Sequence, residues 1–233
     1  IKKTSLSDFK VSRYSKPISC MKLKDGDFVI NAFLVKYNDI FVSTYNAYGL
    51  WFDMGEVPTS GIKSSGVKAI NLKDDYVVSA NIFDKNKEYV TIFTNNRTAK
   101  RVRLEEFEKS SRARRGLLLL REVKTNPYKV INTFIVDNRD YFGFKIGNSI
   151  SNLKNTEITI ADRYKTGSTI FKDDIDDIFV IKSLEEDISV NGDNLDEENE
   201  IEILESNKEE IKPHQVSLLE IDDRLREIDD FLK

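Results

Sequence analysis

Short apolar segments recur along the first 184 residues at a nearly constant distance. The segments are VINAFLV (29–35), VVSANIF (77–83), VINTFIV (130–136) and the weaker IFVIKSL (178–184). Each is rich in Val, Ile and Phe, and no helical apolar period is sustained over 1–183, so the pattern predicts β-strands. Their spacing of 48, 53 and 48 residues indicates an internal repeat of about 50 residues.

Other segments repeat with the same period. SGIKSSGVKAINL (60–72) aligns without gaps with SSRARRGLLLLRE (110–122), which places Gly66 on Gly116, and Gly167 follows 51 residues later. VSTYNAYGLWF (42–52) aligns with IFTNNRTAKRV (92–102). Turn residues at Asn46, Asn95-Asn96 and Gly147-Asn148 predict the tips of hairpins.

Four short strands per repeat of about 50 residues predict an all-β fold of β-propeller-like blades. We expect complete blades at 36–83, 84–136 and 137–184, and part of another at 1–35. About 3.5 blades do not close a ring, and the chain does not begin with Met, so we expect a fragment of a larger protein.

The net charge of −4 hides a strong asymmetry along the chain. Residues 1–172 hold 30 Lys/Arg and 18 Asp/Glu, whereas residues 173–233 hold 6 and 22. A basic body indicates a polyanionic partner, most commonly nucleic acid. One Cys and one His exclude a disulfide framework, a Cys-rich zinc site and a multi-histidine metal centre. No apolar run approaches the roughly 20 residues of a membrane helix, so we expect a soluble, cytoplasmic chain.

Basic residues cluster at two places in the repeat, and these are the candidate DNA-binding residues. One place is the strand after the hairpin tip, with Lys2, Lys3, Lys100, Arg101 and Arg103. The other is the loop before the repeated Gly, with Arg13, Lys16, Lys63, Arg112, Arg114, Arg115, Arg163 and Lys165. Charges that recur once per blade predict a belt that contacts the regularly spaced phosphates of double-stranded DNA. No base-reading helix or zinc finger is present, so binding should be weakly sequence-specific.

Two alternatives to DNA binding remain open at this point. The surface strands could carry Lys and Arg only for solubility. A propeller that serves protein interactions could use the basic belt to bind an acidic protein.

The last part of the chain has a different composition. Residues 185–213 are acidic and poor in aromatics, which predicts a disordered linker. In 214–233 the apolar residues Leu218, Ile221, Leu225, Ile228 and Leu232 alternate at spacings of three and four, which predicts an amphipathic helix. Its expected role is to dock on a partner surface or to modulate the basic belt, unless the segment only solubilises the chain.

Several ordered motifs carry a family resemblance. GLWFDMGEVPTSGIKSSGVKAINLKDDYVV, LEEFEKSSRARRGLLLLREVKTNPYKVI and the opening IKKTSLSDFKVSRYSKP resemble the C-terminal domain of the A subunit of bacterial type IIA topoisomerases. The resemblance covers about residues 1–184. The gyrase Gln-Arg-Arg-Gly-Gly-Lys-Gly box is absent, the nearest match being Ser111 to Gly116, so the sequence is more similar to the Gram-positive topoisomerase IV branch (ParC) than to gyrase.

The resemblance implies a β-pinwheel, in which blades exchange a strand and a basic outer rim binds and bends DNA. It implies that the full protein is an isomerase that passes one duplex through another, for decatenation and relaxation. Mg and ATP, and assembly with the B subunit of topoisomerase IV in an A2B2 heterotetramer, are implied for that enzyme. For this chain it implies no cofactor and no catalytic residue, and a cytoplasmic, nucleoid-associated location.

Overall fold

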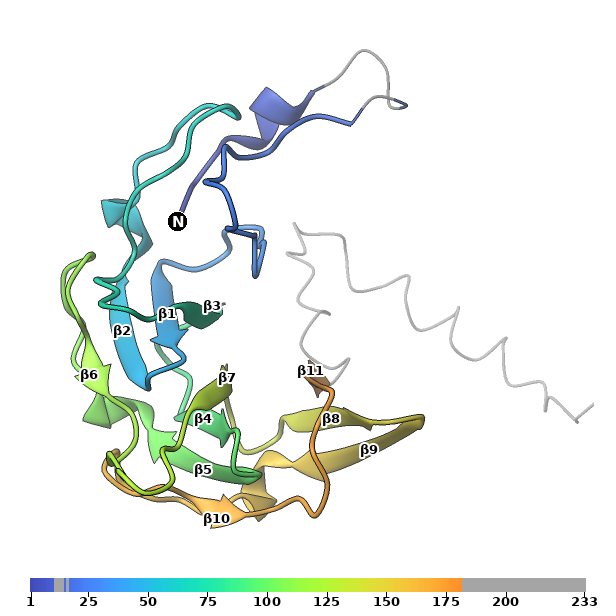
Figure 1. Ribbon diagram of the computed structural model, residues 1–233. Coiled ribbons are helices and arrows are strands. Elements are labelled where there is room, and N and C mark those ends of the chain that lie inside the picture. The colour runs from blue at the N-terminus through green and yellow to red at the C-terminus, as the bar shows by residue number, and fades with distance from the viewer. Residues whose placement is uncertain (11–14, 16, 182–233) are drawn as a thin grey trace, which may run out of the picture. The chain divides into compact units, whose positions relative to one another are not determined.

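The computed structural model describes residues 1–10, 15 and 17–181, and it consists of short antiparallel strands joined by loops and 3-10 helices (Figure 1). The strands are β1 (Asp39–Thr44), β2 (Tyr48–Asp53), β3 (Val77–Phe83), β4 (Tyr89–Thr94), β5 (Thr98–Arg103), β6 (Leu117–Leu118), β7 (Val130–Val136), β8 (Tyr141–Ile146), β9 (Ser149–Lys154), β10 (Ser168–Thr169) and β11 (Asp177–Ile181). The 3-10 helices are η1 (Leu6–Phe9), η2 (Met54–Glu56), η3 (Leu104–Glu106) and η4 (Asn155–Glu157). The predictions for Arg13, Lys16, the acidic linker and the C-terminal helix lie outside the described residues.

The strands form three small sheets, which we call blades one to three. Blade one has the strand order β3-β1-β2-β6, blade two β10-β5-β4-β7, and blade three β11-β8-β9. The hairpins β1–β2, β4–β5 and β8–β9 turn at the tips expected from the sequence. The predicted all-β, propeller-like repeat is therefore confirmed.

Each of the first two blades is completed by a strand from the following repeat. β6 pairs with β2 at Tyr48–Leu118 and Gly49–Leu117, and β10 pairs with β5 at Ala99–Ser168. Within residues 1–181, β6 and β10 lie on the outer side of a curved row of sheets, with β3, β7 and β11 on the inner side (Figure 1). This exchange is the pinwheel feature that the family resemblance implied.

The core lies between successive blades. β1 and β4 are buried along their whole length, because each is covered on both faces of its sheet. Between blades one and two, the rings of Phe41 and Phe107 meet edge to face with centroids 5.2 Å apart. Between blades two and three, the rings of Phe93 and Phe142 meet edge to face with centroids 5.1 Å apart. Packing between successive blades thus fixes the position of each blade relative to the next.

The prediction of a strand at 29–35 is wrong for the described structure. Its counterparts β3 and β7 pair with β1 and β4, whereas no described residue forms a strand with 29–35. Leu34 in this segment is 64% exposed, and Phe28 just before it is 68% exposed. An apolar segment adopts the extended ladder only when a partner strand satisfies its backbone.

Candidate nucleic-acid interface

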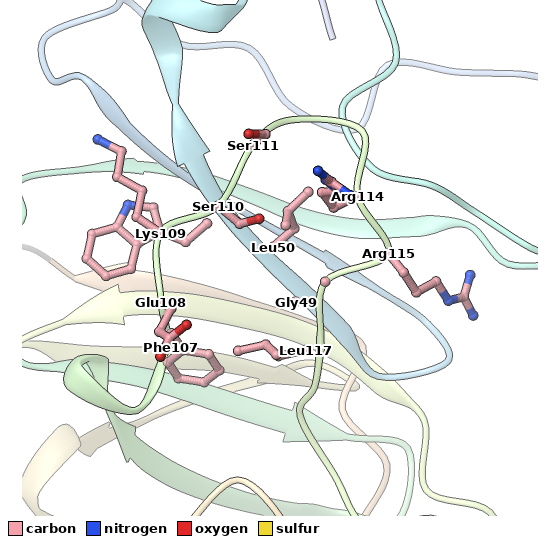
Figure 2. A pocket seen from close by; sticks show the side chains of 12 residues that line it. Gly49, Leu50, Phe107, Glu108, Lys109, Ser110, Ser111, Arg114, Arg115 and Leu117 are labelled. Carbon is pink, nitrogen blue, oxygen red and sulfur yellow. The ribbon is translucent and has the colours of Figure 1, made fainter.

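Three loops of equal design line the outer edge of the blades. Each begins beside an outer strand in parallel, turns, and returns antiparallel to the same strand. In the best-defined case Lys109 forms a parallel bridge with Trp51, and Leu117 then pairs with Gly49, so that the chain surrounds Leu50 (Figure 2). We call 60–66, 110–116 and 161–167 the first, second and third basic loops.

The first and third basic loops follow the same course. Thr59 bridges Lys3, and the Val67 amide then donates to the Ile1 carbonyl at 2.8 Å. Ile160 bridges Arg101 before β10 returns along β5. The three loops therefore surround Lys2, Leu50 and Lys100, which occupy one position of the repeat.

A repeated glycine closes each loop. Gly66, Gly116 and Gly167 have φ of +81°, +84° and +87°. A Cβ at these positions would lie only 2.3, 2.3 and 2.6 Å from the carbonyl oxygens of the outer strands. Both the backbone conformation and the close approach therefore require glycine, which explains the periodic Gly of the sequence.

Several of the predicted cations are exposed on these loops. Lys63, Arg114 and Lys165 are exposed, as is Arg103 at the end of β5. Arg114 and Lys165 occupy the same position in successive loops. Lys165 forms only a surface ion pair with Asp162 at 3.5 Å, and such a pair is worth at most about 1 kcal/mol. These side chains can exchange their weak surface contacts for phosphates.

Arg112 and Arg163 are half-buried at equivalent positions, and each is fixed at its backbone. The Arg112 amide donates to the Glu56 carboxylate at 2.9 Å, and the Arg163 amide donates to the Glu106 carboxylate at 3.1 Å. The guanidinium of Arg112 also donates to the carbonyls of Glu56 and Lys68. Glu56 and Glu106 were not among the predicted site residues, although their spacing of 50 residues was visible in the sequence.

Arg115 braces the second basic loop against blade one. Its guanidinium donates to the carbonyls of Asn71 and Leu72 at 3.1 and 3.2 Å. It also stacks over the ring of Tyr48, 3.8 Å from the centroid. The guanidinium of Arg115 thus makes structural contacts with blade one and is directed away from the centre of the loop (Figure 2).

Lys100 and Arg101 are corrections to the predicted DNA-contacting set, because both are buried. Lys100 is 0% exposed, and its ammonium donates to three backbone carbonyls of the third basic loop. Arg101 is 6% exposed; its guanidinium donates to Ile158 O at 2.7 Å, Asn138 Oδ1 at 2.7 Å and Thr156 O at 3.3 Å. Burial lowers the pKa of both side chains, that of Lys100 to about 7. Neither side chain is exposed for a contact with DNA.

Lys2 and Lys3 are half-buried and also bond to the backbone. Lys2 Nζ donates to the carbonyls of Cys20 and Ile62 at 2.7 and 2.8 Å, and Lys3 Nζ donates to the Met54 carbonyl at 3.1 Å. In the strand cluster predicted from the sequence, Lys2 and Lys100 therefore bond to carbonyls of the basic loops. Lys3 and Arg101 bond to groups outside these loops, and Arg103 is the exposed member.

A hollow of about 390 Å³ opens beside the second basic loop, with Leu50 on its floor and Arg114 and Lys109 on its wall (Figure 2). Lys109 Nζ lies 2.7 Å from both Asp39 and Asp53. These hydrogen bonds raise the pKa of Lys109 and neutralise its charge locally. The free positive charge at this hollow therefore comes from the arginines.

Among the described residues, no three His, Cys, Asp or Glu side chains gather as a group that could hold a metal ion. Within the same residues no helix is long and apolar enough to cross a membrane.

The fold and its repeating basic loops define a strand-exchanging β-propeller domain. The chain belongs to the family described as DNA gyrase C-terminal domain, beta-propeller, whose model matches residues 1–36, 38–84 and 88–137.

Relatives place the chain near one branch of that family. It is 39% identical over 178 residues to the A subunit of DNA topoisomerase 4 from Bacillus subtilis (strain 168), over 75% of this chain and 22% of the relative. The protein of the same name from Staphylococcus epidermidis is 31% identical over 189 residues, 79% of this chain and 23% of the relative. The chain thus spans about a fifth of these proteins. The predicted resemblance to the A subunit of topoisomerase IV is confirmed.

Solved structures of two C-terminal domains of type IIA topoisomerase A subunits resemble this chain. A crystal structure of the C-terminal domain of DNA topoisomerase IV superposes with a TM-score of 0.73 at 34% identity, over 78% of this chain and 58% of that one. The DNA gyrase A C-terminal domain gives a TM-score of 0.61 at 17% identity, over 69% and 57%, and this likeness concerns the fold alone.

Proposed function

We propose that this chain is a DNA-binding and DNA-bending domain of a type IIA topoisomerase, from the A subunit of an enzyme of the topoisomerase IV kind. The observation that carries the proposal is the recurrence of an exposed cation at one position of the second and third basic loops, Arg114 and Lys165, with the exposed Lys63 one residue away from that position in the first loop. Regularly spaced cations suit the regularly spaced phosphates of a duplex. Because the loops follow the outer side of a curved row of blades, a duplex that contacts all of them must bend (Figure 1).

The domain itself performs no chemistry in this proposal. It positions a duplex for strand passage, decatenation and relaxation by the full enzyme, an isomerase. That enzyme would use ATP and Mg in other regions and would assemble with the B subunit of topoisomerase IV into an A2B2 heterotetramer, in the cytoplasm and associated with the nucleoid. The names of the relatives support the assignment to the A subunit of a DNA topoisomerase 4.

The salt dependence of duplex binding tests the proposal. If about six of the seven exposed and half-buried cations of the loops and Arg103 contact phosphates, log Kd should change with log salt at a slope near 5 in magnitude. Replacing Arg114 and Lys165 by Gln should reduce that slope by about 2, because two phosphate contacts are lost.

Lys85→Gln is the matched control, since Lys85 is an exposed lysine in the turn between β3 and β4, away from the basic loops. It should leave the slope unchanged. A slope flatter than about 2, or equal losses for the control and the loop variants, would reject the loops as the DNA-binding surface and would favour an acidic protein as the partner.

A further inference from the structure

The ammonium of Lys100 lies at the centre of the third basic loop. It donates to the carbonyl oxygens of Asp162 at 2.9 Å, Arg163 at 2.7 Å and Lys165 at 2.7 Å. An ammonium has three protons, so every donor is matched by an acceptor of one loop. Carbonyl dipoles that converge on one point repel one another, and the ammonium at the centre of the third loop offsets this repulsion.

The first basic loop has the same arrangement. Lys2 Nζ donates to Ile62 O, which corresponds to Arg163 O in the repeat, and also to Cys20 O. The recurrence of a lysine with its ammonium against the same loop carbonyl shows that the contact belongs to the design of the loop.

The second basic loop differs at this position, where Leu50 is 3% exposed and has no side-chain donor. Here the loop's own arginines make contacts with backbone carbonyls: Arg112 with Glu56 and Lys68, and Arg115 with Asn71 and Leu72. Loop arginines are thus used for bracing where the central lysine is absent. In the third loop the side chains of Arg163 and Lys165 make fewer contacts with backbone carbonyls: Arg163 has one long contact to Leu118 O at 3.5 Å and lies over the rings of Phe107 and Tyr164, 5.9 and 5.2 Å from their centroids.

We propose that Lys100 is a positioning residue for DNA: it does not contact the duplex, but its ammonium fixes the backbone of 162–165 and so directs Arg163 and Lys165 toward the phosphates. Lys2 has the same role for the first basic loop. The proposal rests on the proposed function, because it assumes that the basic loops bind DNA. It assigns Lys100 and Lys2 an indirect effect on affinity that an exposed lysine does not have.

Lys100→Met tests the role, and Lys165→Met is the matched control. Each variant removes one lysine at the third basic loop. Lys100 is buried at the centre of this loop, whereas the Lys165 side chain is 68% exposed and lies outside the centre. Amide hydrogen exchange of 161–167 and duplex affinity over a range of salt are measured for both. Lys100→Met should speed exchange in the loop about tenfold, the factor for one charge-assisted hydrogen bond, and weaken binding severalfold with an unchanged salt slope. Lys165→Met should leave exchange unchanged and reduce the slope by about 0.9.

The outcomes separate the two proposals. Unchanged exchange in Lys100→Met, or faster exchange with unchanged affinity, overturns the positioning role while the DNA-binding proposal stands on Lys165→Met. Full affinity and slope in both variants would overturn DNA binding by the loops as well. If Lys100→Met does not fold, Lys2→Met gives the same test, with amide hydrogen exchange measured over 60–66. We expect faster exchange and weaker duplex binding. No change in either quantity would overturn the positioning role.

Discussion

A buried lysine ammonium is costly unless each proton finds an acceptor, and Lys100 meets this condition with three carbonyls. Burial nevertheless lowers its pKa to about 7, from about 10.5 in an unfolded chain. The carboxylates of Asp162 and Glu106 oppose the shift, and the cations of Arg163 and Lys165 add to it. Lys100 therefore titrates close to neutral pH.

The pKa of Lys100 predicts how stability changes with pH. Between about pH 7 and 10.5 the native state holds fewer protons at this site than the unfolded state, so the contribution of Lys100 to the free energy of unfolding rises with pH. The limiting slope is about 1.4 kcal/mol per pH unit. Urea unfolding between pH 6 and 9 should show this rise relative to Lys100→Met. Parallel profiles for the two proteins would contradict it.

The repeats held enough information to predict the interior position of Lys100. The alignment of 42–52 with 92–102 places Leu50 on Lys100 and Trp51 on Arg101, and apolar residues at both positions indicate burial. The charge of the two side chains indicates the opposite, because Lys and Arg in short strands are usually exposed, and that expectation is wrong here. Among the loop cations predicted to contact DNA, Lys63, Arg114 and Lys165 are exposed, whereas Arg112, Arg115 and Arg163 are half-buried.

At the scale of the element, the glycine that closes each basic loop is as restrictive as any core residue. Gly116 combines a φ of +84° with a carbonyl oxygen 2.3 Å from the position of a Cβ. The loop crosses from blade two to blade one at this point, so a displaced glycine also displaces β6. The period and the hairpin tips were readable from the sequence, whereas the pairing of β6 with β2 was implied only by the family resemblance, because a strand of two residues carries no pattern.

Gly116→Ala should destabilise the chain more than Gly147→Ala. Both glycines have positive φ, but no atom lies within 4 Å of the Cβ position at Gly147, whereas Gly49 O blocks it at Gly116. We expect a loss of about 1 kcal/mol for Gly147→Ala from backbone strain alone and about 2–4 kcal/mol for Gly116→Ala. Urea midpoints measure both. Equal losses would mean that the contact with Gly49 O relaxes freely.

For the molecule as a whole, the distribution of charge is the dominant property. The body up to Lys172 carries +12, and the remaining 61 residues carry −16. The acidic segment lies outside the described residues, but its charge follows from the sequence. Tethered carboxylates reach effective concentrations in the millimolar range, enough to compete with phosphates for the basic loops.

Removal of 185–233 should therefore tighten duplex binding at low ionic strength. The gain should decrease as salt rises, because screening weakens both the competing carboxylates and the phosphates. Titrations of a labelled duplex at about 50 and about 200 mM salt compare the intact and shortened chains. Identical affinities at the lower salt would leave the acidic segment with a solubilising role only.

The exchange of outer strands has a consequence for how such chains lengthen and shorten during evolution. The repeat in the sequence and the blade in space are displaced by one strand, because β6 and β10 each belong to the repeat after the blade that they complete. Tandem duplication of one repeat inserts a blade without altering the strand pairing on either side. The outer strand of the new repeat completes the preceding blade, and the outer strand of the following repeat completes the new blade. Deletion of a last repeat instead removes the covering strand from the blade before it and exposes an edge that invites aggregation. Insertion of a repeat within the chain is therefore easier to tolerate than loss of the last repeat.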